Sequence, residues 1–285
     1  MKKNGVRKSI SNLVIGSEGF VGNALCLYLE KKGEKVVRFD IKRSKKEDAR
    51  VAKLPLNKVD KVYFLAWEVG GAKYLYRENT QLHQLNWNVD ILRNVMMQLQ
   101  TSKIPFIFIS SQLAEETDTA YGATKKLGEL WSHQIGGSCA RLWNVYGVLE
   151  DSTEKSHVAG DFVGQAINTG KIKMMTTGEE KRQFIHVEDV CAGLHHILKN
   201  NLTGMVYDIT SFEWSTVKEL AEHIGKHANA KVIPGTKKGN FSNIAVHKGK
   251  PPGWNHKISL NEGIALMVNE AKEHKKSERL KHKIR

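Results

Sequence analysis

The chain has 285 residues, of which 40% are hydrophobic, so it can bury a large core as one α/β domain or as two smaller ones. No apolar run is long enough to span a bilayer, and no apolar segment follows the charged residues near Met1, so we expect a cytoplasmic protein. The formal net charge of +14 suits phosphorylated small molecules, nucleic acid or an anionic membrane surface as partners, or simply a well-solvated surface.

The cysteines Cys26, Cys139 and Cys191 are widely spaced and lie in apolar contexts. This pattern is typical of buried free thiols and suggests neither a disulfide framework nor a metal cluster. We therefore predict no metal site.

The first elements along the chain are a buried strand at residues 13–15, a glycine-rich turn and an amphipathic helix that runs to about Leu29. The glycines follow a G-x-x-G-x-x-G pattern. In a dinucleotide-binding turn the first glycine permits a tight bend, the second lets backbone amides approach a pyrophosphate, and the third lets the helix pack closely on the sheet. The helix N-terminus then faces the phosphates with its partial positive charge. The residues predicted to bind a dinucleotide here are Gly16, Gly19, Phe20, Val21 and Gly22.

A second strand over residues 35–40 ends in Asp40, about 20 residues beyond the glycines, where a dinucleotide-binding fold expects an acid. This carboxylate would accept hydrogen bonds from the adenosine ribose hydroxyls and repel a 2′-phosphate, so NAD is favoured over NADP. Lys42 and Arg43 follow closely and could reverse the preference, so NADP stays open as an alternative. An ordinary structural glycine turn is the alternative to dinucleotide binding.

Near-continuous apolar runs at residues 62–66, 105–110 and 138–143 predict buried parallel strands. Helical periodicity connects them over residues 79–99 and 119–135. Because strands and helices alternate, we predict an α/β fold with a Rossmann-type, doubly wound parallel sheet.

After about residue 146 the elements become shorter and less regular, which suggests a smaller, mixed α/β substrate-binding part that also returns to the sheet. Thr216 and Glu219 form a capping box that opens a helix to about His227. The other elements predicted here are helices at 160–168, 188–198 and 258–271 and a strand at 205–209. The predicted organisation is a dinucleotide-binding domain at 1–146, a substrate-binding part at 147–272 and a frayed basic tail at 273–285.

Tyr121 and Lys125 lie four residues apart on one face of a predicted helix. A neighbouring ammonium favours phenolate, so the pKa of Tyr121 should fall toward the working pH and the phenol could act as a general acid or base. Ser110 and Ser111 end the preceding strand, where their hydroxyls would reach the ligand crevice. The alternative is an ordinary surface tyrosine and lysine.

Seven motifs in order resemble the extended short-chain dehydrogenases/reductases of the NAD-dependent epimerase/dehydratase type, which act on nucleotide sugars. The resemblance extends from about Asn12 to Gly263. Its motifs are Gly16-x-x-Gly19-x-x-Gly22, Leu65-Ala66, Asn88, Ser110-Ser111, Tyr121-x-x-x-Lys125, Arg141-Leu-Trp-Asn-Val-Tyr-Gly147 and Arg182-Gln-Phe-Ile-His-Val-Glu-Asp189.

The resemblance implies roles for individual residues. Ser111 resembles the catalytic Ser/Thr, Tyr121 the acid/base, and Lys125 the residue that binds the nicotinamide ribose and lowers the tyrosine pKa. Leu65, Ala66 and Asn88 are implied in cofactor binding, and Ser111, Gln112, Asn144, His157 and Arg182 in binding the nucleotide-sugar substrate. The family also commonly forms homodimers through the helices that contain Asn88 and Tyr121.

The residues after Ser111 reduce the number of reactions that the resemblance allows. Relatives that perform 3,5-epimerisation have a cysteine directly after the Ser–Ser pair, and dehydratases have an Asp–Glu pair after the catalytic threonine. Here Gln112 and Leu113 occupy these positions, which leaves 4-epimerisation, C4 oxidation or reduction of a keto-sugar. One alternative is an NADP-dependent keto-sugar reductase resembling GDP-fucose synthase, and another is a non-catalytic nucleic-acid-binding or regulatory protein on the same fold.

Two segments are shorter than the family pattern. Only ten positions separate Ser111 from Tyr121, so the sugar site should be more open than usual. The stretch at residues 50–60 is too short for the usual strand and helix.

Overall fold

The computed structural model describes residues 10–70, 72–147, 157–239 and 247–283. The chain forms two compact units that alternate along the sequence. Unit 1 comprises Met1–Glu68, His83–Arg141 and Cys191–Tyr207, and unit 2 comprises Val69–Leu82, Leu142–Val190 and Asp208–Arg285. The sequence predicted a first domain at residues 1–146 and a second part at 147–272 that also returns to the sheet, and this division stays a prediction. One crossing, between Arg141 and Leu142, lies close to the boundary expected at residue 146.

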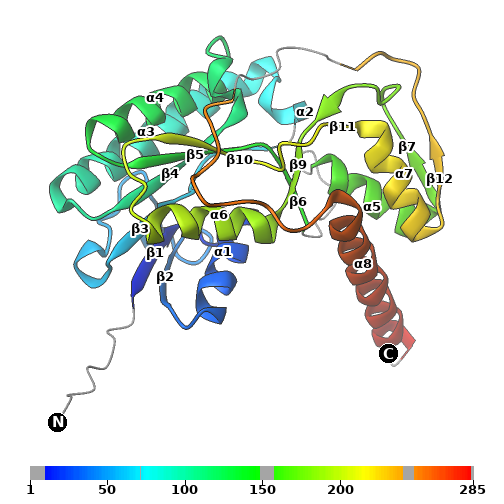
Figure 1. The fold of residues 1–285 in the computed structure, drawn as a ribbon, viewed down its shortest axis with the longest axis horizontal. Helices are drawn as coiled ribbons and strands as arrows, with labels where there is room; N and C mark the ends of the chain where they lie inside the picture. Colours follow the sequence, from blue (N-terminus) through cyan, green and yellow to red (C-terminus); the bar gives the residue numbers. More distant parts are fainter. Residues whose placement is uncertain (1–9, 71, 148–156, 240–246, 284–285) are drawn as a thin grey trace. The chain divides into compact units, whose positions relative to one another are not determined.

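A six-stranded sheet has the order β10-β5-β4-β3-β1-β2, as the ribbon in Figure 1 shows. Its strands are β1 (Ser11–Ile15), β2 (Lys35–Phe39), β3 (Lys61–Phe64), β4 (Phe106–Ser111), β5 (Ser138–Leu142) and β10 (Val206–Ile209). β1 pairs in parallel with β2 on one side and β3 on the other, and β3 pairs in parallel with β4. The predicted doubly wound fold is confirmed, and the strand order reverses between β1 and β3, where such sheets bind ligands.

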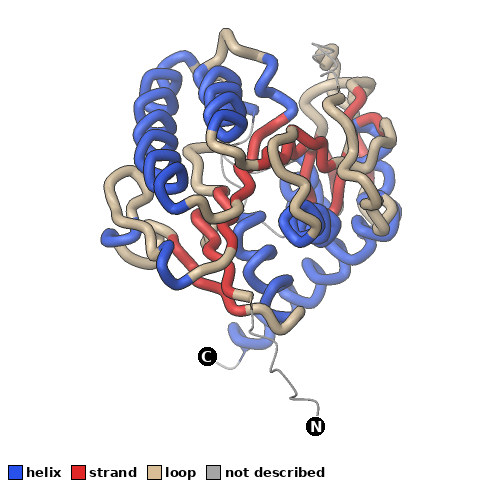
Figure 2. Tube along the Cα trace, turned by 60° about the vertical axis from the view of Figure 1, so that its left-hand side comes forward, coloured by secondary structure: helices blue, strands red, loops and turns tan. Residues whose placement is uncertain are grey.

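The helices that accompany these strands are α1 (Phe20–Lys31), α3 (Glu78–Ser102), α4 (Ala120–Gln134) and α6 (Val187–Lys199). α3 and α4 run side by side (Figures 1 and 2). Both pack on the same face of the sheet, because a Cβ on Gly128 of α4 would meet the ring of Phe108, and Phe108 belongs to one apolar cluster with Leu92 and Met96 of α3. Alternate residues of β1, such as Leu13 and Ile15, complete this cluster, as expected for a strand covered on both faces.

The segment between β2 and β3 contains only two 3-10 turns, η1 (Lys45–Glu47) and η2 (Leu56–Lys58). Within the described residues no strand lies beyond β2, which is therefore the edge of the sheet. The short segment at residues 50–60 therefore has neither the strand nor the helix that the family pattern has there. A short helix, α2 (Ala72–Leu75), follows β3.

Unit 2 contains three main helices, α5 (Val158–Thr169), α7 (Val217–Ala228) and α8 (Leu260–Lys283), around a shared apolar core. The predicted capping box is present, since the Thr216 hydroxyl accepts from Glu219 N and the Glu219 carboxylate accepts from Thr216 N. Three short strand pairs complete the unit: β6 (Asn144–Tyr146) with β9 (Phe184–His186), β8 (Lys181–Arg182) with β11 (Ser215–Thr216), and β7 (Lys171–Lys173) with β12 (Lys231–Ile233).

The last helix, α8, is longer than predicted. The sequence indicated an end near Ala271 and a frayed tail, whereas the helix continues to Lys283. No glycine or proline follows Gly263 in this segment, and alanine, glutamate, lysine and arginine are strong helix formers. Lys272 Nζ donates to the carbonyl of His227 (2.7 Å), near the C-terminal end of α7, where a cation is favoured.

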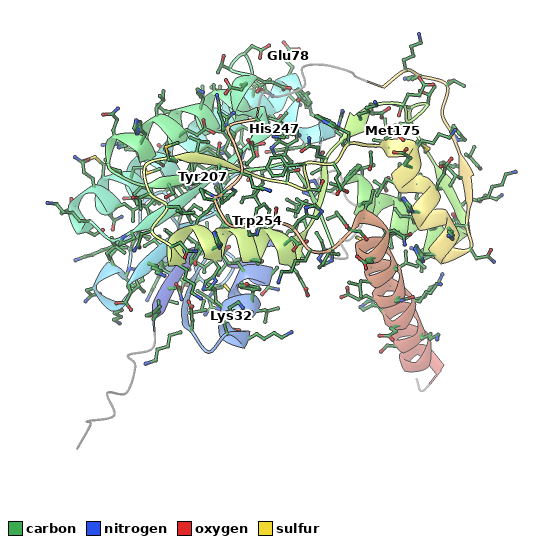
Figure 3. The ribbon with its side chains drawn as sticks, viewed as in Figure 1. Lys32, Glu78, Met175, Tyr207, His247 and Trp254 are labelled. Carbon is green, nitrogen blue, oxygen red and sulfur yellow. The ribbon has the colours of Figure 1, made fainter. Side chains whose placement is uncertain are left out.

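Two buried aspartates of unit 2 hold the connection that leads to α8. Asp208, 1% exposed, accepts from the backbone amides of Lys248 and Gly249 and from Trp143 Nε1 (2.9 Å). Asp189, 3% exposed, accepts from Lys257 N (3.0 Å) and Ile258 N (2.8 Å). His247 and Trp254, labelled in Figure 3, belong to this connection.

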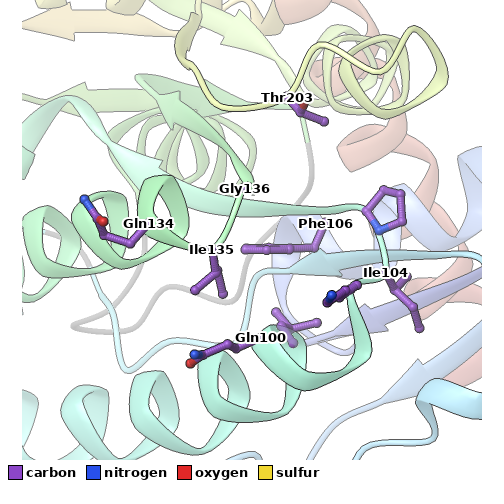
Figure 4. A pocket seen from close by; sticks show the side chains of 10 residues that line it. Gln100, Ile104, Phe106, Gln134, Ile135, Gly136 and Thr203 are labelled. Atoms are coloured by element: carbon purple, nitrogen blue, oxygen red, sulfur yellow. The ribbon is translucent and has the colours of Figure 1, made fainter.

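The three cysteines are free and buried, as predicted. Among the described residues, no helix combines the length and apolar character needed to cross a membrane. A surface pocket of about 420 Å³ lies at the amino end of β4 (Figure 4). It is lined by residues from the end of α3, the start of β4 and the end of α4, including Gln100, Ile104, Phe106, Gln134 and Gly136. Since Ser111 is at the other end of β4, this pocket is separate from the predicted site.

Candidate active site

The glycine turn brings the ends of β1 and β3 into close contact. Gly16 has a φ of +92°, a conformation that favours glycine, and a Cβ there would lie 2.5 Å from Ala66 N. A Cβ on Gly22 would lie 1.9 Å from the carbonyl oxygen of Gly16, so α1 starts in direct contact with the turn. The backbone amides of Leu65 and Ala66 both donate to Ile15 O at 2.8 Å. Gly16, Leu65 and Ala66, all predicted to bind the cofactor, are therefore in contact with one another or with the same strand end.

Gly19 differs from its two neighbours in the pattern. It is the N-cap residue of α1, its φ is −75°, and an added Cβ would meet only Gly16 O at 3.4 Å, an ordinary contact. Packing within the protein therefore does not require glycine at this position. The space that a side chain would take lies over the N-terminus of α1, next to Phe20 and Val21, where a pyrophosphate is favoured. The turn fits a dinucleotide.

Asp40 follows β2 and is held by backbone amides. Its Oδ2 accepts from Glu18 N (3.0 Å) and its Oδ1 from Lys42 N (2.8 Å). Arg43, which could have attracted a 2′-phosphate, lies 3.7 Å from the Glu18 carboxylate and 3.5 Å from that of Glu47. The local charge is thus balanced by carboxylates, which suits the ribose hydroxyls of NAD better than the extra phosphate of NADP.

Asn88 supports the loop that follows β3. The side chain is fully buried, its Oδ1 accepts from Glu68 N (2.7 Å), and its Nδ2 donates to Glu68 O (3.1 Å). Both ends of the amide are thus bonded to one residue of the backbone. The role visible in the structure is to fix the loop beside Leu65 and Ala66, and a direct cofactor contact stays a prediction.

Ser111 and Tyr121 are brought together. Ser111 is the last residue of β4, its hydroxyl accepts from Leu113 N (3.2 Å), and it lies near enough to the phenol of Tyr121 to lower its pKa. Burial nevertheless raises the pKa of Tyr121 to about 12, and the Ser111 hydroxyl only partly opposes this. The sequence-based expectation that this pKa falls is wrong here, because desolvation penalises the phenolate more than its neighbours stabilise it.

Lys125 is 4% exposed and lies one turn beyond Tyr121 in α4. Its Nζ donates to Ile109 O (2.6 Å) and lies 4.0 Å from the ring centroid of Trp67 and 5.7 Å from that of Tyr121. Burial lowers the pKa of Lys125 well below its usual value, although Glu129 opposes the shift. The predicted Ser–Tyr–Lys set is therefore assembled at the carboxyl end of β4.

The short connection between Ser111 and Tyr121 fixes the start of α4. Gln112 opens a 3-10 turn, η3 (Gln112–Glu115), and the Thr119 hydroxyl caps α4 by accepting from Gly122 N (3.0 Å). A Cβ on Gly122 would lie 2.1 Å from Glu116 O, so only glycine lets the helix start so close to the turn. The geometry places Gln112 directly beside Ser111.

A buried ion pair that sequence reasoning missed lies behind this set. Glu129 Oε1 accepts from Ser110 Oγ and from Arg141 Nε, both at 2.6 Å, and Glu129 Oε2 accepts from Arg141 Nη2 at 2.7 Å. Arg141 is fully buried and also pairs with Glu115 at 2.8 Å. In the sequence, only the position of Glu129 could have indicated this ion pair. It is a carboxylate four residues after Lys125, and so it lies on the same face of α4 as Lys125. The pair fixes the end of β4.

The remaining predicted residues belong to unit 2. Asn144 begins β6, and its Nδ2 donates to Gln183 O (3.2 Å), directly beside Arg182 of β8. His157 is exposed and is the N-cap residue of α5. Unit 2 thus brings Asn144 close to Arg182, while His157 starts a helix. Their contacts with a substrate remain predictions.

The sequence model of the NAD dependent epimerase/dehydratase family matches residues 12–210. The chain belongs to this family. The match covers the glycine turn, Asp40, the Ser–Tyr–Lys set and both motifs of unit 2 that were recognised in the sequence. It confirms the predicted resemblance, the enzymatic character of the chain and NAD as its cofactor.

Relatives in the NAD dependent epimerase/dehydratase family differ in the reactions their names describe. A UDP-N-acetyl-alpha-D-glucosaminuronate decarboxylase of Bacillus cytotoxicus is 22% identical over 78% of this chain and 82% of its own. The GDP-L-fucose synthase of Escherichia coli is 25% identical over 88% of this chain and 93% of its own.

Solved structures show the same fold. An epimerase of Methanothermobacter thermautotrophicus superposes with a TM-score of 0.78, at 21% identity and 95% coverage of both chains. The UDP-glucose 4-epimerase of Thermotoga maritima superposes with a TM-score of 0.75, at 19% identity, over 93% of this chain and 99% of its own.

Proposed function

We propose that the protein oxidises a nucleotide-activated sugar by NAD-dependent hydride transfer at a hydroxyl-bearing carbon, C4 of the sugar, and acts through the resulting keto-sugar as an epimerase or dehydrogenase. The observation that supports this most directly is the assembly of Ser111, Tyr121 and Lys125 on β4 and α4. β4 is next to β3, whose end contacts the glycine turn at Gly16. A sugar hydroxyl beside Tyr121 is then within reach of a dinucleotide bound at this turn.

In the proposed reaction the phenolate form of Tyr121 takes the proton of the sugar hydroxyl, and Ser111 hydrogen-bonds the same sugar oxygen. Lys125 binds the ribose next to the reacting ring and contributes its positive charge. NAD, when bound, accepts the hydride from the sugar carbon. An epimerisation would be completed when the hydride returned to the opposite face of the carbonyl carbon and Tyr121 returned the proton to the carbonyl oxygen. Release of the keto-sugar before that return would complete an oxidation.

We assign substrate binding to the residues that the family resemblance indicates. The Arg182 guanidinium suits the diphosphate of the nucleotide, because arginine forms paired hydrogen bonds with phosphate oxygens. Asn144 is proposed to contact the same diphosphate region, and Gln112 the sugar next to Ser111. His157 is proposed as a phosphate contact or as a second acid/base.

The names of the relatives fit a reaction at C4. A ketone at C4 of a sugar with a C6 carboxylate is a β-keto acid, which loses CO₂ with little help from the protein. Epimerisation and decarboxylation can therefore share the step that Tyr121 performs. Which one follows depends on whether the substrate has a carboxylate.

The environment of Tyr121 favours a second candidate, reduction of a keto-sugar. Burial raises the pKa of Tyr121 to about 12, so the phenol is protonated at neutral pH. A protonated phenol is ready to donate to a ketone oxygen as hydride arrives. Similarity to GDP-L-fucose synthase is consistent with this direction.

We also propose a homodimer formed through α3 and α4. Each helix presents large apolar side chains to solvent: Leu85 and Met97 on α3 are 40% and 55% exposed, and Leu127 and Leu130 on α4 are 41% and 56% exposed. Exposed apolar surface of this kind marks interaction sites.

The proposal is tested by incubating the purified protein with NAD and UDP-glucose, UDP-glucuronate, UDP-N-acetylglucosamine or GDP-sugars, with NADH or NADPH and a 4-keto-sugar in parallel. Products are identified by mass spectrometry and NMR while cofactor absorbance is followed. We expect turnover of at least one sugar that depends on Tyr121. Absence of turnover on every sugar in both directions, with NAD bound, would overturn the proposal.

A further inference from the structure

Trp67 stands directly after Ala66 at the carboxyl end of β3, and its ring covers Lys125. We propose that Trp67 is a positioning residue that holds the Lys125 ammonium in place for the reaction at Tyr121. The inference rests on the proposed function for its consequence in catalysis, while the position of the ammonium can be measured without any substrate.

The Trp67 ring is itself fixed by aromatic neighbours. It packs edge-on against Phe108, with ring centroids 5.3 Å apart and planes at 64°, and against Phe64, at 6.1 Å and 61°. Both phenylalanines are buried residues of the apolar cluster under α3. A ring held between two aromatic neighbours offers a stable face to a neighbouring cation.

The ammonium of Lys125 is held from two sides. Ile109 O accepts from Nζ at 2.6 Å, and the face of Trp67 lies 4.0 Å from Nζ, with Phe108 at 5.0 Å. The attraction between an ammonium and an aromatic face grows when water is excluded, and Lys125 is 4% exposed. The ring therefore replaces part of the lost hydration of the charge.

Without the ring, other groups would compete for the ammonium. Glu129 lies four residues further on α4, and its charge acts on Lys125. Glu129 already accepts hydrogen bonds from Ser110 and Arg141, and a lysine turned toward it would leave Tyr121. Trp67 and Ile109 keep the ammonium near Tyr121, which lies one turn earlier in α4.

Two substitutions separate the effects of the ring. Trp67→Leu keeps an apolar cover but removes the π face, so the pKa of Lys125 should fall by about half a unit to one and a half units. Trp67→Ala opens the cover to water, so this pKa should rise toward the ordinary lysine value of 10.5. Trp67→Phe retains a ring and should stay close to the parent protein.

The pKa of Lys125 is read from the ¹³Cε NMR shift of lysine-labelled protein, with Lys125→Arg used to assign the signal. Trp87→Leu is the matched control, because it removes a different tryptophan whose ring holds Arg50 at 3.5 Å, and it should leave the Lys125 signal unchanged. Far-UV circular dichroism and melting curves check that each variant is folded.

Opposite shifts in Trp67→Leu and Trp67→Ala, followed by parallel shifts in the pH profile of kcat, would support the proposal. An unchanged Lys125 titration in both folded variants would overturn it, whatever their activity. If the titrations shift while the parent protein turns over no sugar, the positioning of the ammonium stands and the proposed reaction fails. If the Ala variant does not fold, the comparison of Trp67→Leu with Trp67→Phe decides: a lowered Lys125 pKa in the Leu variant alone supports the proposal, and an unchanged one overturns it.

Discussion

A Cβ added to Gly22 would lie 1.9 Å from the carbonyl oxygen of Gly16. Gly22→Ala must therefore displace α1 from the turn, and we expect it to lower the free energy of unfolding by about 1–3 kcal/mol, as overpacking does. Gly164→Ala is the control, because a Cβ there meets nothing within 4 Å and alanine should stabilise α5 by about 0.5–1 kcal/mol. Chemical denaturation measures both, and equal effects would contradict the packing argument.

Tyr121→Phe removes the proposed acid/base while keeping the ring. We expect kcat to fall about 10²–10⁴-fold, the usual contribution of a positioned proton donor or acceptor. The Kd for NAD, measured by calorimetry, should change little. Tyr63→Phe removes another buried hydroxyl, one with no hydrogen-bond partner among the described residues, and should retain activity. A Tyr121→Phe enzyme within tenfold of the parent would exclude the proposed role.

Asp40→Asn tests the preference for NAD. Loss of the charged acceptor should weaken NAD binding about tenfold or more, since hydrogen bonds to a charged group contribute about 1.5–3 kcal/mol. The affinity for NADP should rise relative to the affinity for NAD, because the carboxylate that repels the 2′-phosphate is gone. Asp48→Asn is the control, as that carboxylate pairs with Arg50 at 2.6 Å. Titrations with both cofactors give the ratio, and an unchanged ratio would argue against Asp40 as the selecting residue.

The pair formed by Glu34 and His195 should make unit 1 sensitive to acid. His195 Nε2 lies 2.9 Å from Glu34 Oε1. Burial lowers the pKa of His195 below 6.5, so the stability it contributes is lost as the pH falls below that value. Burial alone would raise the pKa of Glu34, but hydrogen bonds from His195 and Asn12 hold it below 4.5, and this contribution is lost at still lower pH.

Both shifts therefore predict that the melting temperature falls on acidification. His195→Gln should be less stable than the parent at neutral pH by about 1–3 kcal/mol and should lose less stability on acidification. His133→Gln, at an exposed position of α4, serves as the control. Parallel pH curves for His195→Gln and the parent would refute the linkage.

Leu130→Glu should separate the proposed homodimer into monomers, because it places a charge in the apolar face of α4. Leu27→Glu on α1 is matched to it, since both leucines are 56% exposed. Light scattering after size exclusion gives the mass of each. A monomeric parent protein, or a dimer that survives Leu130→Glu, would rule out the interface.

Features encoded locally could be predicted from the sequence. The spacing of Gly16 and Gly22 and the box formed by Thr216 and Glu219 each depend on a few neighbouring residues. The pKa of Tyr121 could not be predicted, because it depends on how completely α4 and β4 exclude water. Trp67 over Lys125 also escaped notice, since their contact joins two elements far apart in the chain.

The carboxylates of Asp189 and Asp208 have a consequence for the synthesis of the chain. Asp189 is bonded to amides that follow it by 68 and 69 residues. At about 5–20 residues per second, a ribosome needs about 3–14 s to deliver these amides. Until then the Asp189 carboxylate must keep its hydration. A nascent chain stopped before Lys248 would leave Asp189 without both of these amides and Asp208 with Trp143 Nε1 but without the amides of Lys248 and Gly249.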